Sequence, residues 1–158
     1  PLSFAVLLNL ASVCNAEDKN VLWGFITRYA PGASPATAPI LDELAGYALA
    51  TYRDFVKPAK AYRAPTEAER AALEDLAATL EALPPDAAAE DIQYQVYEVG
   101  KRHGFTNLRE WFGALYEVLL GQTQGPRMGS FFALYGLPET VTLIQAALAG
   151  EDLAADLR

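Results

Sequence analysis

Apolar residues recur every three or four positions along almost the whole chain, and this spacing is the strongest constraint on its fold. No stretch shows the sustained alternation of apolar and polar residues, bounded by turn residues, that is typical of a strand. Proline and glycine divide the apolar pattern into segments, as in residues 30–39 and at Pro84 and Pro85. The sequence therefore predicts an all-α fold, a compact bundle of about seven or eight helices.

The length and composition fit a single helical domain that spans residues 1–158. A chain of 158 residues with 52% hydrophobic residues is not a disordered tail, and it can bury a core without a metal or a disulfide. Cys14 is the single cysteine of the sequence, which excludes an internal disulfide and fits a reducing compartment. We therefore expect a cytoplasmic protein.

The first sixteen residues carry no charge, and their apolar run resembles the centre of a signal peptide. No basic residue precedes the run, however, and the segment is shorter than the ~20 residues that cross a bilayer. The spacing from Phe4 to Cys14 is that of a nearly buried core helix with a narrow polar stripe through Asn9 and Ser12. We expect no contact with a membrane.

The negative charge is concentrated in one segment. The chain has 12 Lys and Arg against 20 Asp and Glu, a net charge of −8, which argues against a protein that coats DNA. Residues 66–98, a predicted helical hairpin, hold nine acidic residues and one basic residue and so account for the whole net charge. With the excess acid confined to this hairpin, a locally basic face elsewhere could still bind a phosphate backbone.

Two short segments hold most of the remaining basic residues. They are Arg53, Lys57, Lys60 and Arg63 in the first segment, and Lys101, Arg102, His103 and Arg109 in the second. Such clusters can contact nucleic-acid phosphates. They can equally be solvated helix ends whose charges complement the helix dipole. Composition alone favours the second interpretation.

Aromatic and basic groups share part of one predicted helix surface. Tyr94, Tyr97 and Lys101 fall at positions i, i+3 and i+7, with Arg102 adjacent. This arrangement suits unstacked bases and their phosphates. In the alternative interpretation, the two tyrosines flank the core and only their hydroxyl groups face solvent.

A glycine-flanked turn places Arg127 at the start of a helix. Gly125 permits the turn and Pro126 suits the first helical position. A cation beside free backbone N–H groups predicts an anion or phosphate site. Alternatively, Arg127 pairs with a nearby carboxylate and fixes the turn.

Nothing in the sequence predicts a complete active site. His103 is the single histidine and lies at a predicted helix end, with no cysteine or second histidine nearby to complete a metal site. Cys14 lies on the apolar helix, where a thiol is unreactive. The chain has no Gly-x-x-x-x-Gly-Lys loop for a nucleotide. We therefore expect no catalytic residue, metal or cofactor within these 158 residues.

Several short motifs spread over nearly the whole chain carry a resemblance to a known family. They lie in residues 1–4, 7–10, 15–25, 54–58, 111–122, 125–127, 129–131 and 135–136. Taken together, they resemble the C-terminal anticodon-binding domain, the α-helix cage, of class I lysyl-tRNA synthetases. The Gly125-Pro126-Arg127 segment is the most specific of them, and the acidic hairpin 66–98 matches least well.

The resemblance implies that the chain is a C-terminal piece of a larger synthetase, with a catalytic domain upstream on the same chain. That family uses ATP to attach lysine to tRNA(Lys). Its His-Ile-Gly-His-like and Lys-Met-Ser-Lys-Ser-like catalytic motifs have no counterpart in this sequence. The piece by itself is therefore expected to be inactive, and ATP would bind in the catalytic domain.

The partner implied by the resemblance is the anticodon region of tRNA(Lys), whose unstacked bases aromatic and basic side chains can bind. Side-chain type and placement, rather than family correspondence, give the candidate contacts. These are Arg127, Lys101, Arg102, Arg109, His103, Tyr97, Tyr94, Lys57, Lys60 and Arg63. The alternative is a helical protein-interaction domain whose acidic hairpin binds a partner and which does not bind RNA. A stand-alone helical enzyme would lack a site.

Overall fold

The computed structural model describes residues 2–157, and all regular secondary structure in this range is helical. The eight α-helices of the described range are α1 (Phe4–Cys14), α2 (Lys19–Tyr29), α3 (Pro39–Thr51), α4 (Glu67–Glu81), α5 (Ala89–Arg102), α6 (Leu108–Leu115), α7 (Met128–Tyr135) and α8 (Leu137–Leu148). Shorter π and 3-10 turns are η1 (Tyr52–Val56), η2 (Lys57–Ala59), η3 (Tyr116–Leu120) and η4 (Ala155–Leu157). The predicted all-α bundle is confirmed.

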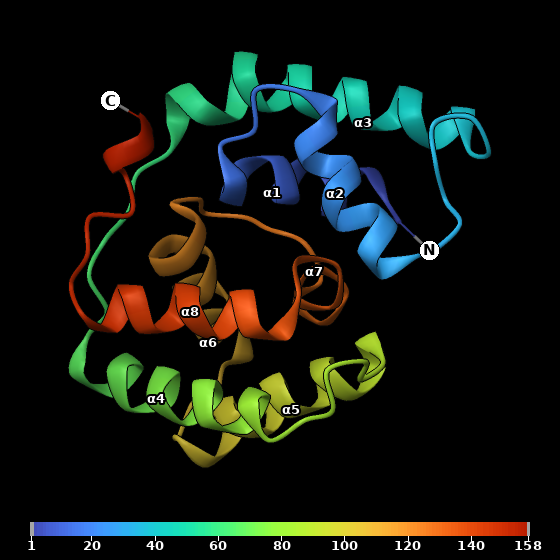
Figure 1. Ribbon diagram of the computed structural model, residues 1–158. Helices are drawn as coiled ribbons and strands as arrows, with labels where there is room; N and C mark the ends of the chain where they lie inside the picture. The colour runs from blue at the N-terminus through green and yellow to red at the C-terminus, as the bar shows by residue number, and fades with distance from the viewer. Residues whose placement is uncertain (1, 158) are drawn as a thin grey trace.

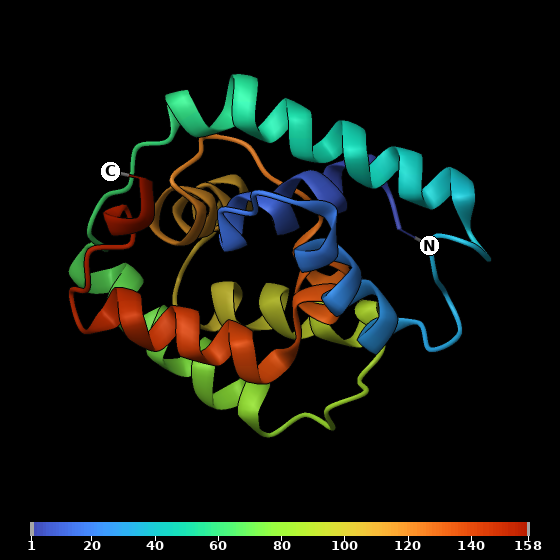
Figure 2. The ribbon, with the colours of Figure 1, turned by 45° about the horizontal axis from the view of Figure 1, so that its top comes forward.

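The helices form three tiers (Figure 1). Helices α1, α2 and α3 lie at the top, α4 and α5 at the bottom, and α6, α7 and α8 between them. Figure 2 shows α3 as the outermost helix of the upper tier, with α1 and α2 beneath it. One hydrophobic core lies among α1–α3 and a second among α4–α8. Helix α7 joins them, because Leu134 packs in the first core and Phe131 in the second.

Helix α1 is a core helix, as predicted, but its polar stripe does not face solvent. Asn9 and Ser12 are both buried, whereas Phe4 is 36% exposed. Ser12 Oγ donates to Gln122 Oε1 at 2.7 Å, and Gln122 Nε2 donates to Asn9 Oδ1 at 2.9 Å. The stripe lies inside the protein, where a side chain from a distant loop satisfies its polar groups.

At the end of α3, the side chains do not continue the helical spacing of apolar residues. Helical spacing places Phe55 on the inner face, yet its side chain is 75% exposed, and Val56 packs on the core instead. The cause is the π turn η1, whose i→i+5 hydrogen bonds add one residue to the turn and rotate the side chains that follow. Residues 52–56 contain no Pro or Gly, so the sequence gives no local signal for this π turn.

Helix ends follow the sequence more closely. Thr66 and Glu69 form a capping box at the start of α4, as their Thr-x-x-Glu spacing predicts. Asp18 is the N-cap of α2, and its carboxylate accepts a hydrogen bond from the Asn20 N–H at 2.7 Å. Asn15 instead closes α1 in the left-handed conformation, with φ 46°.

Helices α5 and α7 approach each other closely, and this contact places the loop before α7 beside α5. The Gly129 N–H donates to Gln93 Oε1 at 2.6 Å, and a Cβ at Gly129 would overlap the Ala89 carbonyl oxygen. Only glycine fits this position without a backbone shift.

No single helix within residues 2–157 has the length and apolarity of a membrane span. Helices α7 and α8 meet that test only as a pair, and they are bent by 106° at the break between them.

Candidate nucleic-acid interface

A groove of about 480 Å³ lies between α5, α6 and the loop that precedes α7. Three of the residues predicted to contact RNA line it, one from each of these elements: Tyr97, Arg109 and Arg127. The structure therefore brings together one aromatic ring and two guanidinium groups that are separated in sequence.

The groove has an aromatic wall. The rings of Tyr97 and Phe112 pack edge to face with centroids 5.2 Å apart, and Tyr97 remains 37% exposed. Tyr116 donates its hydroxyl hydrogen to the Pro126 carbonyl oxygen at 3.0 Å, and burial raises the pKa of Tyr116. Aromatic faces of this kind can stack on an unpaired base.

The loop at the groove rim is fixed by polar contacts to α1. Gln122 Nε2, which contacts Asn9, also donates to the Gln124 carbonyl oxygen at 3.2 Å. A Cβ at Gly125 would overlap the Tyr116 ring, so the loop lies directly on that ring. The side chains of the loop are thus presented from a backbone that is anchored on both sides.

The two guanidinium groups of the groove differ in their partners. Arg127 is the N-cap residue of α7 and makes two hydrogen bonds to Glu90, at 2.8 and 3.0 Å. The alternative interpretation of Arg127, a pairing with a nearby carboxylate, therefore describes this state of the protein. The Arg127 guanidinium lowers the pKa of Glu90. Arg109 is exposed and forms no ion pair with a carboxylate in residues 2–157.

The basic cluster at the end of α5 lies outside the groove lining and is paired. Arg102 makes two hydrogen bonds to Asp75, at 2.7 and 3.0 Å, and His103 Nε2 lies 2.8 Å from the same carboxylate. The Arg102 guanidinium, followed by His103, holds the pKa of Asp75 well below its usual range. Lys101 pairs with Glu98 at 3.3 Å.

Lys60 lies in a partly buried cage rather than on an open surface. Its Nζ donates to the Ser12 carbonyl oxygen at 2.9 Å and lies 5.5 Å from the Tyr52 ring centroid and 5.3 Å from that of Tyr62. Burial, followed by the nearby Lys57 charge, lowers the pKa of Lys60 to about 8.

The other two cations of this segment have different surroundings. Arg63 binds both Glu69 oxygens, at 2.7 and 2.9 Å, and donates to Glu117 at 2.9 Å. Lys57 lines a separate cavity beside Tyr52 and makes no ion pair with a described carboxylate. The segment 57–63 is therefore not a uniform basic face.

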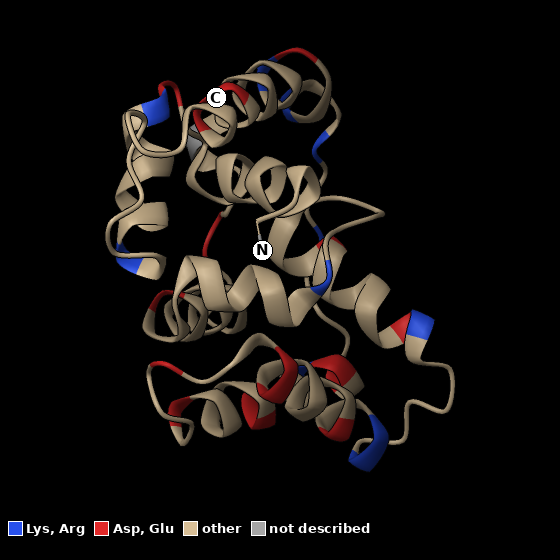
Figure 3. Ribbon diagram, turned by 90° about the vertical axis from the view of Figure 1, so that its right-hand side faces the viewer, with Lys and Arg blue, Asp and Glu red and all other residues tan. Residues whose placement is uncertain are grey.

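The sequence predicts that the acidic hairpin is electrostatically separate from the predicted contacts, and the structure contradicts this. Figure 3 shows many Asp and Glu residues gathered on the lower tier, where α4 and α5 lie. Its carboxylates form four of the ion pairs just described: Glu69 with Arg63, Asp75 with Arg102, Glu90 with Arg127, and Glu98 with Lys101. The excess acid does lie in residues 66–98, but it is not separated from the predicted basic contacts, because a charge count along the chain cannot show which opposite charges the fold brings together.

Comparison with known proteins gives close relatives of one kind. A lysine–tRNA ligase of Roseobacter denitrificans is 56% identical over 153 residues, which are 97% of this chain and 29% of that protein. Lysine–tRNA ligases of Rickettsia bellii and Rickettsia felis are 50% and 47% identical over 147 residues, 93% of this chain. The chain is homologous to one segment of lysine–tRNA ligases. It spans only about 28% of the length of these relatives. No family model and no solved structure matches it.

One part of the groove, a face of α6 and η3, is not among the predicted contacts, although helical spacing indicates it. Phe112, which the apolar spacing of residues 108–119 places on the inner face of its helix, packs against the core and also lines the groove. Arg109, Phe112, Gly113 and Tyr116 follow the i, i+3, i+4, i+7 spacing of one helix face, and all four line the groove. Tyr94, in contrast, is 59% exposed and does not line it.

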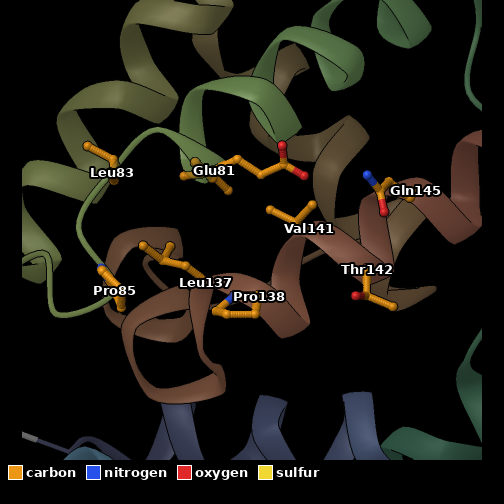
Figure 4. Close-up of a pocket in the computed structure, with 9 residues that line it drawn as sticks. Glu81, Leu83, Pro85, Leu137, Pro138, Val141, Thr142 and Gln145 are labelled. Atoms are coloured by element: carbon orange, nitrogen blue, oxygen red, sulfur yellow. The ribbon is translucent and has the colours of Figure 1, made fainter.

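A second cavity, of about 310 Å³, lies between the end of α4 and α8 (Figure 4). Its lining is mostly apolar, with Leu83, Pro85 and Val141 among its residues, and Glu81 provides its single charge. A lining with a carboxylate and no cation does not suit an RNA phosphate. None of the predicted contacts lies in this cavity.

The described residues also provide no centre for metal or thiol chemistry. No group of three His, Cys, Asp or Glu side chains within residues 2–157 is placed to hold a metal ion. Burial raises the pKa of the Cys14 thiol to about 11, so the thiol stays protonated at neutral pH.

Proposed function

We propose that this chain is the anticodon-binding domain of a class I lysyl-tRNA synthetase and that its groove binds the anticodon loop of tRNA(Lys). The observation that carries the proposal is the groove itself, in which aromatic rings and the guanidinium groups of Arg109 and Arg127 share one opening. Homology of 93–97% of the chain to a segment of lysine–tRNA ligases supports the choice of tRNA.

In this proposal the parent enzyme is cytoplasmic and uses ATP to attach lysine to tRNA(Lys). Lysine, ATP and the catalytic residues belong to a catalytic domain upstream, which is the second partner of this chain. The chain alone binds RNA, does not aminoacylate it and needs no cofactor.

An unpaired base would stack on the exposed face of Tyr97, an interaction worth about 1–3 kcal/mol per base. Arg109 and Arg127 would neutralise the backbone phosphates on either side. A lysine anticodon is rich in uracil, which stacks weakly, so hydrogen bonds to base edges must provide much of the discrimination. Thr123 and Gln124, at the rim, carry donors and acceptors for these edges.

The proposed contacts outside the groove form a second set, which binds RNA more weakly than the groove residues. They are Tyr94, Lys101, Arg102 and His103 on or beside α5, and Lys57, Lys60 and Arg63 before α4. Because most of these cations already have a partner in the protein, we propose that they contribute less than the groove residues.

The test is a fluorescence-anisotropy titration of the anticodon stem–loop of tRNA(Lys) with the purified chain. We expect Tyr97→Ala to weaken binding about fivefold or more, since a stacked base is lost. We expect Arg109→Ala to reduce the slope of log K against log[salt] by about 0.7–0.9, because one phosphate contact disappears. Tyr47→Ala is the matched control, a 66% exposed tyrosine on α3.

A stem–loop with an altered anticodon should bind more weakly than the native loop to the unmodified chain. Equal affinity for both loops would contradict anticodon recognition. Equal losses for Tyr97→Ala and Tyr47→Ala would contradict the groove as the binding site.

A second candidate function is a protein-interaction domain that binds a basic partner through the acidic hairpin 66–98. It is favoured by exposed carboxylates such as Glu67, Glu74 and Asp91, which form no ion pair within the described chain. This function predicts binding to a basic protein and no response of the titration to RNA sequence.

A further inference from the structure

Arg127, one of the two cations that line the groove, forms an ion pair with Glu90. Both terminal nitrogens of Arg127 donate to the two carboxylate oxygens of Glu90, at 2.8 and 3.0 Å. The two side chains come from different helices, Glu90 from the first turn of α5 and Arg127 from the N-cap of α7. Their side chains are 77% and 48% exposed, so the pair lies in contact with water at the groove rim.

A phosphate group would use the same face of the same guanidinium. Guanidinium binds carboxylate and phosphate through the same pair of parallel N–H···O bonds. Glu90 engages one N–H of each terminal nitrogen, which together form one edge of the guanidinium, and Arg127 cannot offer that edge to RNA at the same time. An RNA phosphate that binds Arg127 in this manner must therefore displace the Glu90 carboxylate.

We propose that Glu90 competes with RNA phosphate for Arg127 and thereby sets the affinity and the salt response of the groove. This inference rests on the proposed function of the groove and adds to it an acidic residue with an antagonistic role.

The structure makes this exchange possible at Arg127 in particular. Exposed ion pairs are weak, typically worth no more than a factor of about five in an equilibrium constant. The displaced Glu90 side chain would return to solvent and stay near the N-terminus of α5, whose dipole favours a carboxylate. Arg63, by comparison, is held by two carboxylates at once, and one of them, Glu69, has a side chain only 11% exposed.

The test compares Glu90→Gln with Asp91→Asn in the same stem–loop titration. Asp91 is the neighbouring exposed acid of the same helical turn and forms no ion pair in the described chain, so both variants remove one negative charge from one place. We expect Glu90→Gln to raise RNA affinity about two- to fivefold above the level of Asp91→Asn. The slope of log K against log[salt] should steepen by up to ~0.9 in Glu90→Gln alone, because in the unmodified chain the Arg127 contact forms only in those complexes where phosphate has displaced Glu90.

Both substitutions should be repeated in an Arg127→Ala background. There, Glu90→Gln and Asp91→Asn should have equal effects, because the competition no longer exists. Thermal unfolding of each variant checks that the fold is retained.

The outcomes separate the two proposals. If the unmodified chain discriminates between anticodons but Glu90→Gln matches Asp91→Asn, the competition is refuted and the proposed function stands. If Glu90→Gln binds RNA tightly where the unmodified chain binds it poorly, the competition is supported. If no variant binds RNA, both proposals fail.

Discussion

Arg127 and Lys60 were both predicted as phosphate contacts, yet the fold places them in opposite environments. Arg127 lies at the rim of the groove and is held by the exposed carboxylate of Glu90. Lys60 has no carboxylate partner among the described residues; a backbone carbonyl and two tyrosine rings surround its ammonium group instead. A side chain that is charge-neutralised at the surface can exchange its partner for RNA, whereas a cation in a cage has a structural role.

The contacts of the Lys60 cage also hold the segment before α4, residues 57–63, in place. Lys60 fixes it to the end of α1 through the Ser12 carbonyl, and the Ala61 N–H donates to the Gly121 carbonyl oxygen at 2.8 Å. Ser12 in turn donates to Gln122, whose amide holds the loop at the groove rim. The two regions are therefore connected, because the cage and the loop at the groove rim are both held to the end of α1.

The largest effect expected from this comparison is that of a charge reversal. Lys60→Glu should lower the free energy of unfolding by about 3 kcal/mol, because it places an uncompensated carboxylate against the Ser12 carbonyl and the negative ring faces of two tyrosines. Arg127→Glu reverses a charge that is in water and should change stability much less. Urea unfolding followed by far-UV circular dichroism measures both. Equal losses would show that Lys60 is no more structural than Arg127.

The connection between the two regions predicts a smaller loss at Gln122. Gln122→Ala removes the partner of the buried side chains of Asn9 and Ser12, which should cost about 1–3 kcal/mol. Gln145→Ala makes the same truncation at an exposed position of α8 and should be nearly neutral. The measurement is again urea unfolding. If the two variants unfold alike, the polar contact between α1 and the groove loop does not stabilise the fold.

The sequence predicted the helices well because each carries its own signals. Apolar spacing predicts α1 and also α8, where Val141, Ile144 and Leu148 share one face, and the Thr-x-x-Glu pattern from Thr66 predicts the start of α4. The failures occurred where the fold overrides local pattern. The loop glutamine that satisfies Asn9 lies 113 positions away in the chain, and the π turn that rotates Phe55 outward contains no proline or glycine that would predict it.

The groove, too, depends on residues that are distant in the sequence and meet only in the fold. Side-chain chemistry pointed to Tyr97, Arg109 and Arg127, but charge and spacing could not show that they meet at one opening. Nor could they show that Asp75 pairs with Arg102 and Glu90 with Arg127, because these residues are 27 and 37 positions apart in the chain. A reading of helix faces could have added Phe112, which shares a face with Arg109.

The smallest effect expected is a pH dependence that distinguishes the caged cation from the exposed one. The pKa of Lys60 is about 8 in the folded chain and 10.5 in its ordinary state, so between these values the unfolded chain binds more protons. The free energy of unfolding contributed by Lys60 should therefore rise with pH across this window. In Lys60→Met this contribution is absent, so the stability difference between the unmodified chain and the variant should shift in favour of the unmodified chain from pH 7 to pH 10.

Two features keep this measurement specific to Lys60. The Cys14 thiol, whose pKa burial raises from 9.0 to about 11, destabilises the folded chain as pH rises above 9, but it is present in both proteins and largely cancels in the difference. Arg127→Met is the matched control, because a guanidinium stays charged over the whole range and its difference should be flat. Urea unfolding monitored by tryptophan fluorescence gives both curves. A Lys60 difference as flat as that of Arg127 would mean that the ammonium group is solvated, and the contrast between cage and rim would disappear.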